Sequence, residues 1–342
     1  MTIRVGINGF GRIGRSVFRI LCERAEVEVV CINDLYENEH LAYLLEFDSV
    51  MGPFGRQVSF DDETMTVDGR SIRMTAERDP AKIPWGELGV DVVVESTGAF
   101  RSREKLERHL AGGAKKVILT VPPKDEVDRM VVIGVNEGQL LASDRIVSNA
   151  SCTTNCLAPI ARILDEAFGI EEGFVSTVHA YTNDQRLADV AHEDLRRSRA
   201  AALNIIPTST GAARAVGKVL PRLKGKLDGV ALRVPVPDGS LIDFSCRLAE
   251  RPDAAAINAA VARAAAGDLQ RIVEYSERPL VSTDIIGNPH SSIFDALSTQ
   301  AAGDGFARVV AWYDNEWGYS QRVVDLLLLL AGTGAQPVGR ES

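Results

Sequence analysis

The sequence predicts an α/β protein of two domains, a parallel-sheet domain followed by an α+β domain with a mostly antiparallel or mixed sheet. Three observations support this fold class. At 342 residues the chain suits two domains better than one. Residues 1–150 alternate short β-rich runs with helical patterns, as parallel sheets require. From Thr177 onward the β-rich runs become longer.

The first structural unit lies between Met1 and Asp34. Residues 3–8 form a predicted strand that runs into a G-x-G-x-x-G motif, Gly9 to Gly14, and then into a helical pattern. A second predicted strand, 27–32, ends just before Asp34. The glycines permit a tight turn and close approach of a pyrophosphate, and an acid at this spacing accepts hydrogen bonds from a ribose. This pattern predicts a Rossmann-type dinucleotide-binding domain.

The predicted sheet continues with short runs that end in small or polar residues. These runs are residues 91–96, 116–120 and 145–148. They are typical of parallel strands with a ligand at their carboxyl edge. The helical segment 101–110 is charged and is expected to be a solvated face. We therefore assign residues 1–150 to the cofactor domain.

A cysteine motif opens the second half of the chain. Ser151 is a predicted N-cap, so Cys152 would lie in the first turn of the helix that follows. The unpaired N–H groups and the dipole at this end favour a thiolate. Further along the chain, His179 ends a β-branched run. A thiol with an imidazole partner is the standard arrangement for a covalent thiol nucleophile.

The remaining chain completes the domain assignment. Predicted strands 229–234 and 241–246 belong to a catalytic domain, 151–318, and the polar segment 181–201 is long enough to be a functional loop. The apolar run 326–330 is too short to span a membrane, and we expect residues 319–332 to form a helix packing back on the cofactor domain. Residues 333–342 are expected to be a disordered tail.

Composition excludes several classes of function. The formal net charge of −9 argues against a nucleic acid or a membrane surface as partner. The five cysteines match no zinc spacing, so we expect no metal and reduced thiols in a cytoplasmic protein. Any anionic substrate must then be held by local arginines.

Several motifs together resemble the phosphorylating glyceraldehyde-3-phosphate dehydrogenase family. The resemblance covers the chain up to about Leu330 and is carried by these segments: 7–15, 148–156, 177–179, 182–185, 208–213 and 312–319. It implies oxidation of D-glyceraldehyde 3-phosphate with NAD and inorganic phosphate to 1,3-bisphosphoglycerate, in glycolysis or gluconeogenesis. Cys152 would attack the aldehyde and carry the thioester, and His179 would manage the proton.

The resemblance also implies two anion sites. Thr182 and Arg233 match the family's site for the substrate phosphate. The site for inorganic phosphate is matched by Ser151, Thr153, Arg197, Thr210 and Gly211. Arginine suits both sites because its planar fork binds phosphate bidentately. Arg196 and Arg199 remain alternatives to Arg197.

The cofactor contacts implied by the resemblance are spread along the chain. They are Arg12 and Ile13 for the pyrophosphate, Asp34 for the ribose, Arg78 for the adenine side, Thr120 for the nicotinamide-side ribose, and Asn315 for the nicotinamide amide. Asp34 and the bulky Leu35 favour NAD. Val190-Ala191 replaces the Leu-Pro of many NAD-specific relatives, so NADP use stays open.

A second departure from the family pattern is Pro237-Asp238-Gly239-Ser240, where Pro-Asn-Val-Ser is usual. The loop 181–201 corresponds to the family's interface loop, so a homotetramer is expected. Two other functions stay open at this stage. One is the related erythrose-4-phosphate dehydrogenase activity, and the other is a catalytically idle binding or regulatory protein on the same scaffold. The retained Cys152 and His179 speak against the idle scaffold.

Overall fold

The computed structural model describes residues 2–332, which divide into two compact units. Residues up to 131, 137–150 and 320–332 belong to the first unit, and residues 132–136 and 151–319 belong to the second. The expected tail, 333–342, lies outside the described residues. No helix among the described residues is long and apolar enough to cross a membrane.

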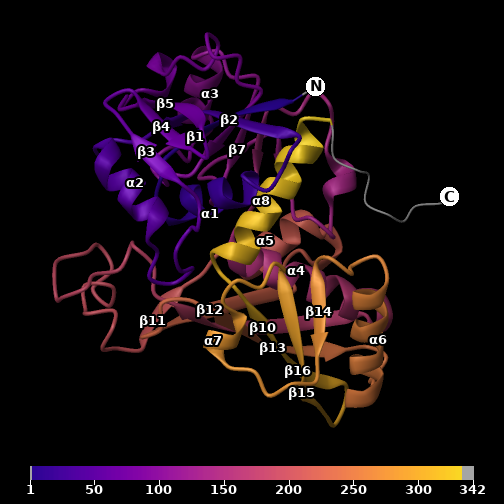
Figure 1. Cartoon of the computed structure of the whole chain (residues 1–342). Helices are drawn as coiled ribbons and strands as arrows, with labels where there is room; N and C mark the ends of the chain where they lie inside the picture. Colours follow the sequence, from indigo (N-terminus) through magenta and orange to yellow (C-terminus); the bar gives the residue numbers. More distant parts are fainter. Residues whose placement is uncertain (1, 333–342) are drawn as a thin grey trace. The chain divides into compact units, whose positions relative to one another are not determined.

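The first unit is built on a nine-stranded sheet in the order β3-β4-β5-β2-β1-β6-β7-β9-β8 (Figure 1). Its strands are β1 (Ile3–Asn8), β2 (Val27–Asn33), β3 (Val58–Phe60), β4 (Thr64–Val67), β5 (Arg70–Thr75), β6 (Val92–Glu95), β7 (Lys116–Leu119), β8 (Arg129–Met130) and β9 (Ile146–Ser148). All neighbouring pairs are parallel except β3–β4 and β4–β5. The predicted Rossmann-type sheet is confirmed, with an antiparallel edge added by β3 and β4.

Helices complete the first unit. They are α1 (Arg12–Leu21), α2 (Asn38–Glu46), α3 (Arg103–Ala111) and the part 320–330 of α8 (Trp317–Leu330), with the short 3₁₀ turns η1 (Pro80–Lys82) and η2 (Glu137–Gln139). The buried ring of Trp85 packs against β1 at Gly6, where a Cβ would stand 2.3 Å from a ring carbon. Lys116 Nζ donates to the carbonyl of Leu330, 2.8 Å away, which ties the end of α8 to β7.

The second unit contains a seven-stranded mixed sheet in the order β11-β12-β10-β13-β16-β15-β14. Its strands are β10 (Ile170–Ala180), β11 (Ile206–Ser209), β12 (Leu227–Val234), β13 (Ser240–Leu248), β14 (Val273–Ser276), β15 (Ser292–Ala302) and β16 (Phe306–Tyr313). Parallel pairing joins β10 to β12 and β14 to β15, and the other pairs are antiparallel. The predicted mixed sheet is therefore confirmed.

Helices pack on one face of this second sheet. They are α4 (Cys152–Phe168), which contacts four strands, α5 (Ala212–Val219) and α6 (Ala254–Ala266), with α7 (Ser282–Ile285) and η3 (Pro221–Leu223) as short additions. Along β10 the residues that face α4, such as Val175 and Thr177, are buried, whereas Phe174 on the other face is 48% exposed. The sheet therefore has one helix-covered face and one open face.

Candidate active site

The second unit brings Cys152 and His179 together. Helix α4 begins at Cys152, and the predicted N-cap is confirmed because Ser151 Oγ accepts a hydrogen bond from the Thr154 N–H at 3.1 Å. His179 lies at the carboxyl end of β10, one residue before the strand ends. The Sγ of Cys152 is 3.4 Å from Nε2 of His179. A helix start and a strand end thus place the two groups in direct contact.

The orientation of the imidazole is set by its neighbours. Nδ1 of His179 lies 2.7 Å from the carbonyl oxygen of Ala180 and 3.0 Å from Nη1 of Arg233. The two hydrogens of Nη1 have other acceptors, because Nη1 donates to Ala180 O at 3.0 Å and to Thr182 Oγ1 at 2.9 Å. We therefore assign the Nδ1–H to Ala180 O. This tautomer leaves the Nε2 lone pair facing Sγ.

Burial decides the resting charge of the pair. Removal of water raises the pKa of Cys152 to about 11, against the opposing effects of the Arg233 charge and of hydrogen bonds from Thr153. Burial, and then the Arg233 charge, lower the pKa of His179 to about 3. These shifts oppose the thiolate expected at the helix start, where Cys152 itself is partly exposed. Their directions favour a thiol and a neutral imidazole in the resting pair.

Proton transfer from Sγ to Nε2 leaves the net charge of the pair unchanged. The desolvation cost of this transfer is therefore smaller than the cost of ionising Cys152 alone or His179 alone. Arg233 and the start of α4 both stabilise the resulting sulfur anion. His179 is thus placed to act as a general base toward Cys152 when sulfur attacks an electrophile.

Tyr313 completes this cluster and was not singled out from the sequence. Its hydroxyl lies 2.9 Å from Thr153 Oγ1 and 2.8 Å from Thr177 Oγ1, which joins the end of β16 to α4 and β10. Its ring meets His179 edge-on, with centroids 5.9 Å apart. The residue is 1% exposed. The sequence signal available for this residue was its place in the motif 312–319. Its partners, Thr153 and Thr177, could not be predicted because they are distant in sequence.

The predicted anion-binding residues fall into separate groups. Thr182 and Arg233 are brought together, as described. Arg197 is joined instead to Asp184 by an ion pair and to Thr208 Oγ1 at 3.0 Å. Asp184 also accepts a hydrogen bond from Thr182 Oγ1. Asp184 thus links the two arginine groups.

The other predicted members of the inorganic-phosphate site lie at two helix starts. Ser151 and Thr153 stand at the beginning of α4. Thr210 and Gly211 immediately precede α5, where Thr210 Oγ1 accepts a hydrogen bond from the Ala212 N–H at 3.2 Å. No hydrogen bond among the described residues joins Arg197 to these four. Their association in one site stays a prediction.

The first unit holds the predicted dinucleotide turn. Gly9 has a φ of +92°, and a Cβ there would stand 2.7 Å from the Thr97 nitrogen. A Cβ on Gly14 would stand 2.1 Å from the Gly9 oxygen. Gly11, by contrast, faces open space, and α1 begins after it with neither a capping side chain nor an acid in its first turn. This open helix start fits a pyrophosphate.

The proposed cofactor residues of the first unit follow strand ends. Asp34, after β2, accepts hydrogen bonds from the backbone N–H groups of Phe10 at 2.7 Å and Tyr36 at 3.2 Å, so it also holds the glycine-rich turn. Thr120, after β7, is buried and donates to Glu95 O at 3.1 Å. Ile13 is the second residue of α1, whose first residue, Arg12, forms a bidentate ion pair with Asp48.

The two remaining predicted cofactor residues lie apart from these. Arg78 is exposed in the segment after β5. Asn315 belongs to the second unit, where its Oδ1 accepts a hydrogen bond from Ser240 Oγ at 2.6 Å. Their contacts among the described residues do not test a role toward a cofactor, and these roles stay predictions.

A buried polar network lies beneath the glycine-rich turn and was missed from the sequence. Glu95, at the end of β6, accepts from Asn8 Nδ2 at 2.5 Å and lies 2.9 Å from His109 Nε2, and both Glu95 and His109 are 0% exposed. Asn33 Nδ2 donates in turn to Asn8 Oδ1 at 2.8 Å. The ends of β1, β2 and β6 are thereby fixed relative to one another.

Comparison with known proteins agrees with this geometry. Residues 3–103 match the family described as glyceraldehyde 3-phosphate dehydrogenase, NAD binding domain, and residues 151–315 match its C-terminal domain. The chain is 54% identical to glyceraldehyde-3-phosphate dehydrogenase 1 of Bacillus subtilis, over 98% of this chain and 100% of the relative. It is 55% identical to glyceraldehyde-3-phosphate dehydrogenase of Mycobacterium tuberculosis, over 96% and 99%. Identity to glyceraldehyde-3-phosphate dehydrogenase 2 of Streptomyces avermitilis is 52%, over 96% and 99%.

The pairing of Cys152 with His179 predicts selective alkylation. Iodoacetamide at pH 7 should label Cys152 first, because its thiol has a base at 3.4 Å, whereas Cys31, Cys156 and Cys246 are buried. His179→Asn should slow the labelling of Cys152 by about a hundredfold. Peptide mapping of samples taken at successive times measures the alkylation rate of each cysteine.

Cys22 serves as the internal control for this experiment. It is half-buried, and burial raises its pKa to about 11 without a histidine partner. Its rate should be the same in both proteins. An unchanged Cys152 rate in the variant would show that the imidazole does not act as its base.

Proposed function

Because the chain belongs to the glyceraldehyde-3-phosphate dehydrogenase family, we propose that it oxidises D-glyceraldehyde 3-phosphate with NAD and inorganic phosphate to 1,3-bisphosphoglycerate. It is an NAD-dependent oxidoreductase acting on an aldehyde. The observation that carries the proposal is the contact between Cys152 Sγ and His179 Nε2. The alternatives, erythrose-4-phosphate dehydrogenase and a catalytically idle scaffold, are not favoured, because the relatives are named glyceraldehyde-3-phosphate dehydrogenase.

In this mechanism His179 moves one proton and Cys152 forms one bond. Nε2 accepts the thiol proton as Sγ attacks the aldehyde carbon, which produces the alkoxide of a thiohemiacetal and an imidazolium. The Nε2–H and the backbone N–H of Cys152 then stabilise the developing oxyanion. Bound NAD supplies the hydride acceptor, which leaves an acyl thioester on Cys152. Inorganic phosphate attacks the thioester carbon, loses its proton to solvent and leaves as the acyl phosphate, while the Cys152 sulfur takes its proton back from the His179 imidazolium.

Arg233 is the strongest candidate for the substrate phosphate. Its Nη1 is fully used by Ala180 and Thr182, but its Nε is buried and has no hydrogen-bond acceptor among the described residues. A buried cationic donor without an acceptor is unfavourable, and an anion would satisfy it. Arg197, which is already paired with the carboxylate of Asp184, is the candidate for inorganic phosphate.

Mixing the protein with NAD, the aldehyde and phosphate should produce absorbance at the reduced-nicotinamide band. Cys152→Ser should abolish this turnover because a hydroxyl is a much weaker nucleophile than the sulfur at the start of α4. The variant should still bind NAD, since the glycine-rich turn lies in the other unit. Steady-state rates and an NAD titration measure the two effects. Substantial turnover by the serine variant would remove Cys152 as the nucleophile.

The two anion sites should separate by mutation. Arg233→Ala should mainly raise the KM for the aldehyde, and Arg197→Ala should mainly raise the KM for phosphate. Each lost charge-assisted contact should cost about 1.5–3 kcal/mol, or roughly ten- to a hundredfold in the affected parameter. Arg196→Ala is the matched control on the same loop, because Arg196 is exposed, and it should change neither parameter. Equal losses in both parameters from both variants would contradict two separate sites.

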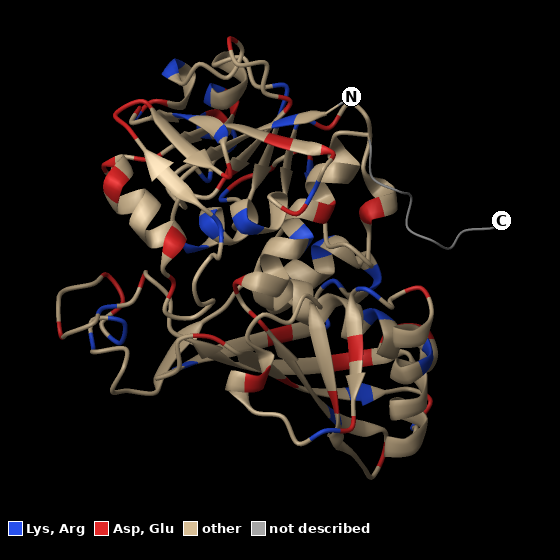
Figure 2. Ribbon diagram, in the orientation of Figure 1, with Lys and Arg blue, Asp and Glu red and all other residues tan. Residues whose placement is uncertain are grey.

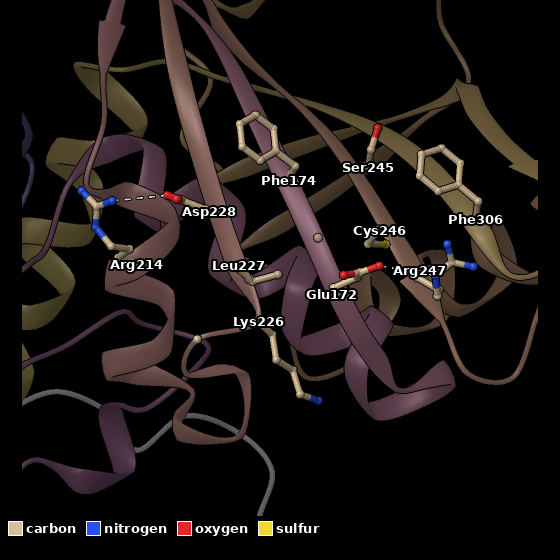
Figure 3. Close-up of a pocket in the computed structure, with 12 residues that line it drawn as sticks. Glu172, Phe174, Arg214, Lys226, Leu227, Asp228, Ser245, Cys246, Arg247 and Phe306 are labelled. Atoms are coloured by element: carbon tan, nitrogen blue, oxygen red, sulfur yellow. Dashed lines mark hydrogen bonds and ion pairs between the residues drawn. The ribbon is translucent and has the colours of Figure 1, made fainter.

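We further propose that the protein is a homotetramer, which two exposed apolar surfaces of the second unit support. The first is the open sheet face, where Phe174, Val230 and Phe306 are between 38% and 48% exposed. Phe174 and Phe306 line a hollow of about 580 Å³ in this face. Figure 3 shows both rings together with the ion pairs Glu172–Arg247 and Arg214–Asp228, which are formed by other lining residues. Large apolar side chains exposed on one face, within a polar surround, are typical of a protein–protein contact.

The second surface is the long connection between β10 and β11. Leu187, Leu195 and Leu203 are each more than 80% exposed there. In Figure 2 the ribbon of this connection includes both Lys or Arg positions and Asp or Glu positions, so it can form ion pairs as well as apolar contacts with a second copy. Two different self-complementary surfaces are what a tetramer of two-fold symmetry requires.

The free cysteines support a cytoplasmic location.

Native mass spectrometry should give four times the 37.0 kDa mass of one chain. Leu203→Asp should yield dimers rather than monomers, because the open sheet face would still associate. Leu141→Asp is the matched control, since Leu141 is 55% exposed but belongs to the first unit, and it should leave the tetramer intact. A monomeric parent protein would contradict the proposal.

A further inference from the structure

Two buried carboxyl groups face each other in the second unit, outside the pair that carries the reaction. Asp238 lies in the turn between β12 and β13, and Asp314 follows β16. Each is 1% exposed, and each carboxyl shifts the pKa of the other. Two neighbouring carboxylates from which water is excluded cannot both be charged, so one of them must carry a proton.

Counting donors shows where the proton lies. Asp314 accepts three backbone N–H groups, from Glu316 at 2.8 Å, Trp317 at 2.5 Å and Gly287 at 2.7 Å. Asp238 Oδ1 accepts the Gly239 N–H at 2.7 Å and the Asn315 N–H at 3.2 Å.

Asp238 Oδ2 differs from these atoms. It is buried and receives no hydrogen bond from a donor among the described residues. A proton on Oδ2, donated to Asp314, satisfies every atom of the pair.

We propose that Asp238 is a positioning residue for the dehydrogenase reaction, holding a proton whose hydrogen bond to Asp314 fixes the turn that carries Asn315. This inference rests on the proposed function, in which Asn315 contacts the nicotinamide amide. The Asn315 N–H is bound by Asp238, and its side-chain Oδ1 is bound by Ser240, two residues after Asp238. With Oδ1 occupied, the amide Nδ2 is the group presented to a ligand.

The turn between β12 and β13, which carries Asp238, is also connected to the reacting pair. Ser240 Oγ accepts the Ala180 N–H at 3.0 Å, and the carbonyl of Ala180 holds Nδ1 of His179. Gly239 has a φ of +82°, and a Cβ there would stand 2.1 Å from the carbonyl oxygen of Ser282. The turn is therefore packed against α7 and has little room to adjust if the carboxyl pair separates.

The charged groups around Asp238 act in one direction. Burial, and then the negative charges of Asp314 and Glu316 in the segment after β16, raise the pKa of Asp238 to about 9. From α4, the Cys152 thiol is near enough for its pKa to be raised by Asp238. On α7, Asp284 accepts the N–H of Val281. Deprotonation above about pH 9 would place two adjacent charges in the turn and release Asn315.

Kinetic constants from pH 6.5 to 10 for three proteins test the proposal. In the parent, the KM for NAD should rise at least fivefold between pH 7.5 and pH 10. Asp238→Asn keeps a donor toward Asp314 and cannot ionise, so its KM should not change with pH. Asp238→Ala lacks the donor, so its KM should be raised at every pH. Titration of Cys152, whose pKa Asp238 raises, should change kcat and not the KM for NAD, which separates the two effects. A parallel rise of KM in parent and Asn variant would overturn the proposal.

Thermal unfolding tests the shared proton without any activity. The unfolded chain loses the Asp238 proton near pH 4, whereas the folded chain keeps it to about pH 9. Parent stability should therefore fall with rising pH across this window relative to Asp238→Asn. The Tm advantage of the Asn variant should grow from pH 5 to pH 9 and then stay constant. A pH-independent difference would overturn the shared proton.

The two readouts keep the hypotheses apart. Absence of NAD-dependent turnover in the parent would contradict the proposed function while the unfolding data still decide the protonation of Asp238. If the alanine variant does not fold, the comparison of parent and Asn variant decides the question alone.

Discussion

The register between β10 and β12 is the constraint on which the reacting centre depends. The parallel pairing sets His179 beside Arg233, so one guanidinium reaches both Ala180 O and Thr182 Oγ1. A slip of one residue would turn Arg233 to the open face of the sheet. The imidazole would then lose the neighbour that shares its Ala180 acceptor, and the candidate phosphate ligand would leave the site. The sheet thus orients His179, and the start of α4 places Cys152 in contact with it.

Burial then decides which protonation states this arrangement can hold. The Cys152–His179 pair and the Asp238–Asp314 pair meet the same problem, because isolated charge is costly where water is excluded. The first pair stays neutral until an electrophile arrives, and the second keeps one proton between two acids. Each pair therefore holds a movable proton. One is shared with His179, whose Nδ1 contacts Ala180 O, and the other lies on Asp238, two residues before Ser240. Because Asp238 raises the pKa of Cys152, the two protons are electrostatically coupled.

Local patterns in the sequence predicted local structure well. The strand–turn–helix of residues 3–21, the Ser151 cap and the strand ending in His179 each depend on neighbouring residues, and each is present in the structure. The effect of burial on the pKa of Cys152 was not visible in the sequence, because desolvation depends on the whole surrounding fold. Tyr313, the Glu95–His109 contact and the Asp238–Asp314 contact were missed for a related reason. Their partners are separated by 14 to 160 residues, and no spacing rule connects them.

The two arginines show how differently this fold prepares its anion sites. Arg233 is held by backbone and hydroxyl acceptors, with a buried Nε that has no acceptor among the described residues, so an arriving anion displaces nothing. Arg197 is paired with Asp184, whose side chain is 42% exposed. An ion pair so open to water contributes little, so exchanging Asp184 for phosphate costs little. The substrate phosphate stays bound through the whole reaction, and Arg233 offers it a rigid site. Inorganic phosphate enters only at the thioester, and Arg197 offers it an exchangeable site. The two sites therefore match the order in which the two anions are needed.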